Sequence, residues 1–164
     1  SSLRSLNVSG NSLLSSGVSQ LATAVQGSPV ESLYVAGSHA DDVVHSFAMV
    51  VKKSSLKMLD LSFNNISPSD LGGLDKIVDH VDSLCLASNP LGDLGASKIA
   101  AMFSRTMKLR HLDVSNSQLT EKGIETLATA FAANSNGEAT LNVSCSTIAK
   151  GMPHVEGVHV TFTM

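Results

Sequence analysis

The stretch Leu56-Lys57-Met58-Leu59-Asp60-Leu61-Ser62-Phe63-Asn64-Asn65-Ile66 decides the fold of this chain, because its pattern returns along the whole sequence. Apolar residues stand at its first, fourth, sixth and last positions, and an Asn stands at the ninth. Start-to-start spacings between equivalent stretches are 27, 26, 25, 28, 29 and 17 residues. A recurrence of this kind predicts a repeat solenoid. The other stretches begin at Leu3, Val30, Val81, Leu109, Glu138 and Val155, the last two matching less completely.

The hydrophobic period changes within each repeat. The alternation in Leu59-Asp60-Leu61 is typical of a short strand with one buried face. After Gly17, Gly95 and Gly123, apolar residues return at helical spacing. Each repeat is therefore predicted to consist of strand, turn and helix. Because one repeat cannot bury its apolar face alone, stacking is expected to place parallel strands on a concave side and helices on a convex side.

With these residues and this spacing, the sequence resembles the leucine-rich repeat family, and within it the ribonuclease-inhibitor-like class of long repeats. The resemblance implies an α/β fold, a right-handed solenoid shaped as a horseshoe arc of about six repeats. It covers nearly all of residues 1–164, which we expect to form a single domain. Since the pattern is already present at Leu3, we also expect the chain to be a fragment of a longer protein.

The ninth position of the repeat predicts a ladder of buried side chains. An Asn there can donate to and accept from the backbone of neighbouring turns. Ser38, Ser117 and Ser146 stand at this position in their repeats and can do so only in part, so we expect a looser ladder there.

Two segments depart from the regular repeat. In the third repeat, Gly72 and Gly73 predict a short helix, from about Ser69 to Val78. Near the C-terminus, the alternation of Val158 and Val160 predicts a last strand without a following helix.

Composition argues against several classes of function. The 164 residues carry 11 Lys and Arg against 14 Asp and Glu, with a formal net charge of −3, so nucleic acid is not an expected partner. The longest apolar runs are far shorter than the ~20 residues that cross a bilayer, so we expect no membrane insertion. Two cysteines, Cys85 and Cys145, make no disulfide framework. We expect both to be free thiols, and the chain to be cytoplasmic.

Enzyme-like combinations of residues are present but do not fit a catalytic site. His111, Asp113 and Ser115 alternate along one strand, about 6.6 Å apart, which is too far for a nucleophile to bond its base. The carboxylates of Asp60 and Asp113 are expected about 10 Å apart, beyond the range of a retaining glycosidase pair and at the edge of the range of an inverting one, and the sequence shows no apolar pocket that would tune an acid. Cys145 with His159 lacks the further ligands of a zinc site. We therefore predict no enzymatic activity, no metal and no cofactor.

The candidate binding residues are the large side chains of the concave face. Tyr34, Met58 and Phe63 belong to the second and third repeats, with Asp60 between them. Aromatic and Met side chains on a rigid sheet are typical of interface hot spots. An alternative for Phe63 is that it folds over the edge of the solenoid into the core.

A second, polar group on the concave face consists of Arg110, His111 and Asp113 in the fifth repeat. The alternative for this group is an ordinary solvated surface. The side chains that stand two residues after the central residue of each strand are all small. This fits either steric crowding between neighbouring strands or a low surface on which a ligand lies.

These observations favour a non-enzymatic protein–protein interaction module that presents its concave strand surface to a protein partner. The resemblance also implies more specific settings: actin regulators related to tropomodulin and the capping-protein linkers, cytoplasmic immune receptors, and activators of the Ran GTPase. A further alternative is a structural spacer with possible end-to-end self-association.

Overall fold

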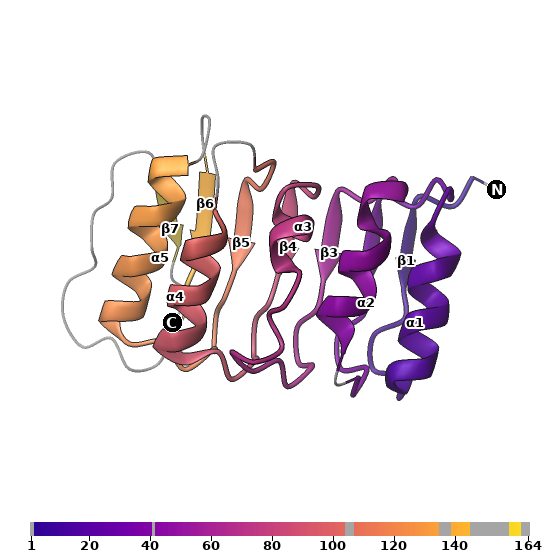
Figure 1. Cartoon of the computed structure of the whole chain (residues 1–164), viewed down its shortest axis with the longest axis horizontal. Coiled ribbons are helices and arrows are strands. Elements are labelled where there is room, and N and C mark those ends of the chain that lie inside the picture. Colours follow the sequence, from indigo (N-terminus) through magenta and orange to yellow (C-terminus); the bar gives the residue numbers. More distant parts are fainter. Residues whose placement is uncertain (1, 41, 104–106, 135–138, 145–157, 162–164) are drawn as a thin grey trace.

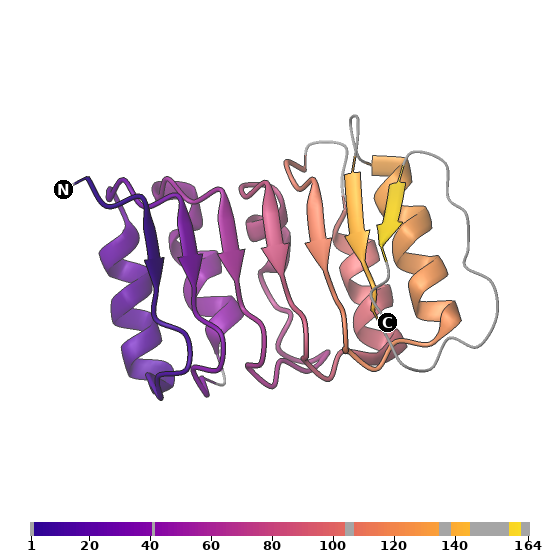
Figure 2. The ribbon, with the colours of Figure 1, turned by 180° about the vertical axis from the view of Figure 1, so that it is seen from behind.

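In the part of the chain that the structure describes, seven parallel strands form one sheet in sequence order, β1 to β7. The structure, a computed structural model, describes residues 2–40, 42–103, 107–134, 139–144 and 158–161. All the described helices lie on one face of the sheet, and we call the other face the open strand face (Figure 1, Figure 2). The elements are β1 (Ser5–Asn7), α1 (Leu14–Val25), β2 (Ser32–Tyr34), α2 (Val43–Val50), η1 (Val51–Lys53), β3 (Met58–Asp60), α3 (Leu74–Val78), β4 (Ser83–Cys85), α4 (Gly92–Met102), β5 (His111–Asp113), α5 (Glu121–Asn134), β6 (Ala139–Asn142) and β7 (Val158–Thr161).

The predicted repeat pattern sets the register of the sheet. The middle leucines of consecutive strands pair directly, as Leu33 with Leu59 and Leu84 with Leu112. Each of these four is at most 1% exposed, so the repeats stack their strands on one continuous apolar core. The prediction of an α/β solenoid of strand, turn and helix is confirmed, and the open strand face is the predicted concave side.

Two buried asparagines hold the turns that follow the strands. The Nδ2 of Asn64 donates to the carbonyl of Val35 at 2.9 Å, and its Oδ1 accepts from the Ser38 backbone N–H at 2.8 Å. The Oδ1 of Asn89 accepts from the backbone N–H groups of Asn64 and Ile66, at 3.0 and 2.9 Å. Each amide therefore pairs polar backbone groups of the preceding repeat that would otherwise be buried without partners.

Serines at the same position make fewer bonds. The hydroxyl of Ser38 donates to the carbonyl of Val35 at 2.8 Å, and that of Ser117 donates at 3.4 and 3.2 Å to two carbonyls. The Nδ2 of Asn89, in contrast, donates to three carbonyls while its Oδ1 accepts two N–H groups. The expected weakening of the ladder at Ser38 and Ser117 is thus confirmed, and Ser146 lies outside the described residues.

The helix of the third repeat is shorter than predicted. We expected it from about Ser69, but α3 begins at Leu74. The carboxylate of Asp70 accepts from the backbone N–H and the hydroxyl of Ser67, at 2.8 and 2.6 Å, and closes a turn where the helix would start. Gly73, the residue directly before α3, has φ +89, in the left-handed region that interrupts a helix and that glycine adopts readily.

The register of the last strand also differs from the prediction. The sequence pattern placed His159 in the centre column of the open strand face. Instead, Thr140 pairs with His159, and Asn142 with Thr161. Because side chains alternate with a period of two, a shift of two residues leaves Val158 and Val160 with the same alternation, so the pattern cannot distinguish the two registers.

Charged residues of alternating sign follow one another along the edge where the strands begin. In chain order they are Arg4, Glu31, Lys57, Asp82 and Arg110, one in each of the first five repeats. From Glu31 onward, the backbone N–H of each of these residues donates to the backbone carbonyl of the preceding charged residue. The N···O distance is 2.8 Å in all four pairs. The carboxylate of Glu31 lies 2.8 Å from Arg4 Nη1 and 2.7 Å from Lys57 Nζ. The edge is therefore close to neutral along its length.

A carboxylate of α4 caps the start of α5. The oxygens of Asp93 accept from the hydroxyl of Thr120 at 2.6 Å and from its backbone N–H at 2.9 Å. These bonds, the hydroxyl contributing most, lower the pKa of Asp93 below its ordinary value. A Cβ on Gly123 would overlap Asp93, so glycine at this position leaves room for the cap.

We expect this cap to make stability depend on pH in the acid range. Because the pKa of Asp93 is lower in the folded chain, the unfolded chain binds its proton first, and stability is lost as pH falls below about 4. The variant Asp93→Asn should be less stable near neutral pH and should lose less stability on acidification. Urea unfolding at a series of pH values between about 6 and 3 measures this, and parallel curves for the two proteins would contradict it.

Candidate functional site

The centre column of the open strand face brings the predicted polar residues into one row. Successive register pairs join Tyr34 to Asp60, Asp60 to Cys85, Cys85 to Asp113, and Asp113 to Asn142. All five are partly exposed. The two aspartates therefore lie two strands apart, as expected, with the thiol of Cys85 between them.

We define the β2–β3 patch as the group of side chains of Tyr34, Met58, Asp60 and Phe63. Tyr34 pairs in register with Asp60, and Met58 lies two residues before Asp60 on the same strand. Tyr34 and Met58 are half-buried, whereas Phe63 is 66% exposed. The alternative in which Phe63 folds into the core is therefore wrong.

Phe63 also stands in an unusual backbone conformation. Its φ is +56, and the equivalent residues of other repeats have positive φ as well. Two of those residues are Gly10 and Gly37, for which this region carries no steric penalty. A bulky aromatic residue there is an outlier.

The second predicted group lies apart from the β2–β3 patch. His111 and Asp113 belong to β5, so β4 separates them from Met58 and Asp60. His111 is exposed, while Arg110 and Asp113 are half-buried. The Nη1 atom of Arg110 is buried and has no hydrogen-bond partner among the described residues.

Both centre-column aspartates stabilise the turns that follow their strands. The Oδ1 of Asp60 accepts from the Ser62 backbone N–H at 2.9 Å. The Oδ1 of Asp113 accepts from the backbone N–H and the hydroxyl of Ser115, at 2.8 and 2.6 Å. The expected spacing of about 6.6 Å is therefore wrong for Asp113 and Ser115, because β5 ends at Asp113 and the chain turns there. The Ser115 hydroxyl is bonded to a carboxylate, and Asp113 has a structural role that its residue type alone does not reveal.

Cys85 is held as a neutral thiol. Burial raises its pKa to about 12, and the negative charges of Asp60 and Asp113 add to the effect. The row of centre-column residues therefore has a small, uncharged side chain between the carboxylates of Asp60 and Asp113.

We expect Cys85 to react very slowly with alkylating reagents. In a Cys145→Ser variant, labelling by iodoacetamide near pH 8 should be at least about a hundredfold slower for the folded chain than in urea, because the thiolate is the reactive form. Equal rates in both conditions would contradict the raised pKa.

Other features add little to the site. Across the described ranges, His, Cys, Asp and Glu do not gather in threes as metal ligands would. The described helices include none with the length and hydropathy to cross a bilayer, and the cytoplasmic location remains a prediction. Cys145, which the sequence places near His159, lies outside the described residues.

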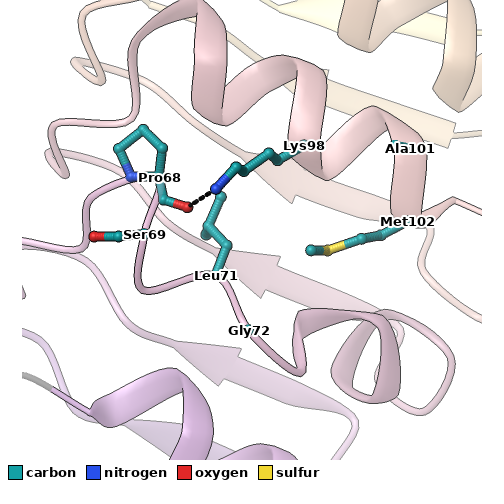
Figure 3. A pocket seen from close by; sticks show the side chains of 7 residues that line it. All are labelled: Pro68, Ser69, Leu71, Gly72, Lys98, Ala101 and Met102. Atoms are coloured by element: carbon teal, nitrogen blue, oxygen red, sulfur yellow. Dashed lines mark hydrogen bonds between the residues drawn. The ribbon is translucent and has the colours of Figure 1, made fainter.

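Sequence reasoning missed one surface, an open groove on the helix face between loop 67–73 and α4 (Figure 3). Lys98 and Met102 contribute to it. The signal was present in Gly72 and Gly73, because a short helix leaves its neighbour partly uncovered.

Comparison with known families agrees with the repeat pattern. One sequence model described as Leucine Rich Repeat matches residues 2–23 and 55–75. Another, described as Leucine Rich repeat, matches residues 80–100 and 107–128. Together they cover just over half of the chain. No curated protein matches it. The narrower ribonuclease-inhibitor-like class remains a prediction.

Proposed function

This chain belongs to the leucine-rich repeat family, whose members generally serve as protein–protein interaction modules, and from this premise we propose that residues 1–164 act as one such module. The partner binds the open strand face, and the β2–β3 patch is the centre of contact. The activity is recognition rather than catalysis.

The observation that carries this proposal is the state of Phe63. A left-handed conformation costs a non-glycine residue about 1–2 kcal/mol, and exposure leaves the ring in water. The backbone conformation belongs to the turn of each of the first five repeats, since Ser88 and Asn116 share it, and the Phe63 N–H donates to the Ala87 carbonyl at 3.1 Å. The exposure of the ring is not offset by packing, since the ring is 66% exposed. An exposed aromatic side chain on a rigid turn is a suitable hot spot.

The surroundings of Phe63 support the same conclusion. Tyr34 offers a half-buried ring and a hydroxyl on the neighbouring strand, and Met58 offers an adaptable apolar side chain. Asp60 adds a carboxylate whose Oδ1 is already bonded to a turn, so it is fixed in place before a partner arrives. Small residues at Ala36 and Ala87 keep the neighbouring surface low.

The test compares a variant of the β2–β3 patch with a control variant of the helix face. The first carries Tyr34→Ala, Met58→Ala and Phe63→Ala. The control carries Met49→Ala and Leu94→Ala, two side chains of the helix face that are 62% and 63% exposed. Affinity capture from cell extract with mass spectrometry should lose specific partners in the first variant and keep them in the control. Identical capture by the native chain and both variants would overturn the choice of surface.

End-to-end self-association is a second candidate, favoured by the exposed apolar side chains of the first repeat. Leu3 and Leu14 are 48% and 56% exposed, and β1 pairs only with β2 in the described sheet. Sedimentation should then show a concentration-dependent dimer that Leu14→Glu abolishes. A native chain that stays monomeric at all concentrations would exclude this candidate.

A further inference from the structure

The first repeat forms one end of the described solenoid, and its helix α1 has a single helical neighbour there. Figure 1 shows α1 as the outermost helix of the row, next to α2. The two helices are in contact, and the hydroxyl oxygens of Ser19 and Ser46 lie 3.2 Å apart between them. The side of α1 that carries Ser19 is therefore covered, and the opposite side forms the end of the described solenoid.

This opposite side of α1 is apolar. Its members are three, four and three residues apart along the helix, so they form one stripe. We call this stripe the α1 end face, and it consists of Leu14, Gly17, Leu21 and Ala24. Ser19 is two residues from both Gly17 and Leu21, which corresponds to about 200° around the helix axis. Leu14 is 56% exposed and Ala24 is also exposed, so the α1 end face is accessible in the described part of the chain.

The first repeat has almost no charge. α1 contains no Asp, Glu, Lys, Arg or His, whereas α3, α4 and α5 each contain charged residues. In residues 1–30 the only charged side chain is that of Arg4, and Glu31 pairs with it at 2.8 Å. A terminal repeat that faces water needs a polar outer surface, whereas the centres of interfaces between identical chains are depleted of charge. The composition of the first repeat is therefore typical of an interface.

Gly17 stands at a position that later repeats use for close contact with the preceding repeat. Like Gly95 and Gly123, it comes four residues after the repeat leucine. A Cβ on Gly95 would lie 3.7 Å from Pro68 Cγ, and a Cβ on Gly123 would overlap Asp93. The three atoms nearest to a Cβ on Gly17 all belong to the leucine of its own repeat. Glycine here marks the side of a helix that another unit approaches, and on α1 no described residue makes that approach.

The α1 end face is complementary to itself in size, because two large side chains alternate with two small residues. The midpoint between Leu14 and Ala24 along the helix is residue 19, and the midpoint between Gly17 and Leu21 is the same residue. If two copies of α1 lie antiparallel about a two-fold axis at this point, each leucine faces a small residue of the other copy. Large side chains then fit into the spaces left by small ones, as helix packing requires.

We propose that two copies of this chain associate through their α1 end faces, with the two α1 helices antiparallel about a two-fold axis. Leu14 of one copy contacts Ala24 of the other, and Gly17 contacts Leu21. Because each copy uses the same surface, the contact closes as a dimer and does not continue as a filament. The inference rests on end-to-end self-association, the second candidate function, and gives it a surface and a geometry. It does not use the β2–β3 patch.

Two charged variants of α1 test the surface. Ala24→Glu brings a carboxylate from each copy into the contact, and Thr23→Glu places the same charge one residue away, at an exposed position of the same helix. Sedimentation over a range of protein concentrations should show a dimer for the native chain and for Thr23→Glu. For Ala24→Glu, association should be at least about a hundredfold weaker, because buried carboxylates would lie without partners. Circular dichroism confirms that both variants are folded.

Cross-linking tests the antiparallel geometry. Leu14→Cys and Ala24→Cys are made separately, each in a Cys145→Ser background, and are mixed in equal amounts. A short bis-maleimide should join the two variants to each other, because these residues meet across the two-fold axis. Each variant alone should remain largely unlinked, because equivalent residues of the two copies would lie about 15 Å apart along the helices.

The outcomes separate this inference from self-association itself. A native chain that stays monomeric at all concentrations overturns both. A dimer that persists in Ala24→Glu, or one that is weakened equally by Ala24→Glu and Thr23→Glu, overturns the α1 interface and leaves self-association to another surface. Cross-linking within Leu14→Cys alone overturns the antiparallel arrangement.

Discussion

Replacing Asn89 by Ala should lower the free energy of unfolding by about 3–5 kcal/mol, the largest effect we expect from a single substitution. Asn89 is 1% exposed, and its Nδ2 donates to the carbonyls of Leu86 and Leu61 at 2.9 and 3.1 Å. Its Oδ1 accepts from the N–H groups of Asn64 and Ile66. Alanine removes every one of these partners, and water cannot replace them in the interior, so each unpaired group costs about 1–3 kcal/mol.

The matched control is Asn11→Ala, at the same position of the first repeat. Asn11 is exposed, and its Nδ2 donates to Val8 and Ser9 carbonyls at 2.9 and 3.4 Å. Because water can replace these bonds, the loss should be below about 1 kcal/mol. Urea unfolding followed by circular dichroism gives both values. Similar losses in the two variants would show that the buried ladder does not contribute as we describe.

The second large effect is expected from Gly73→Ala, with a loss of about 2–4 kcal/mol. Two costs combine at this residue. Gly73 has φ +89, which an alanine adopts only with strain, and an added Cβ would lie 2.8 Å from the Cβ of Ala48 in α2. The Ala48 methyl group is 4% exposed and has no flexible end to move aside.

The neighbouring glycine supplies the control. Gly72 has ordinary φ, and a Cβ there meets nothing within 4 Å, so Gly72→Ala should be neutral or stabilise by up to about 1 kcal/mol. In an Ala48→Gly background, which by itself loses about 1 kcal/mol of helix stability, Gly73→Ala should cost less than in the native chain, because the clash is gone and only the strain remains. If Gly72→Ala and Gly73→Ala have equal effects on the unfolding midpoint, the close approach to α2 is not the cause.

The fold could be predicted because its signal is redundant. The pattern around Leu59 and Leu61 recurs in repeat after repeat, and each copy predicts the same strand, turn and helix. The predictions that failed concern features that are determined by a single side chain. The start of α3 depends on the bonds between Asp70 and Ser67, and these appear in the sequence only as common polar residues. The register of β7 could slip by two residues because Val158 and Val160 keep the same alternation.

For the candidate site, the sequence predicted which residues are neighbours, but not how exposed they are or how their pKa values shift. The columns of the repeat placed Tyr34 beside Asp60 correctly. They could not show that Phe63 is exposed, because exposure follows from a left-handed turn that glycine occupies in the first two repeats. The raised pKa of the Cys85 thiol likewise follows from burial and two flanking charges, which exist only once the strands are paired.

The alternating charges at the strand edge have a consequence for how such a chain can gain or lose repeats. Deleting the repeat that contains Lys57 would bring Glu31 beside Asp82, so two negative charges would meet where opposite charges now do. Deleting two consecutive repeats would preserve the order of signs. Electrostatics at this edge therefore favours a change in length by two repeats over a change by one, by less than about 1 kcal/mol because the charges are exposed.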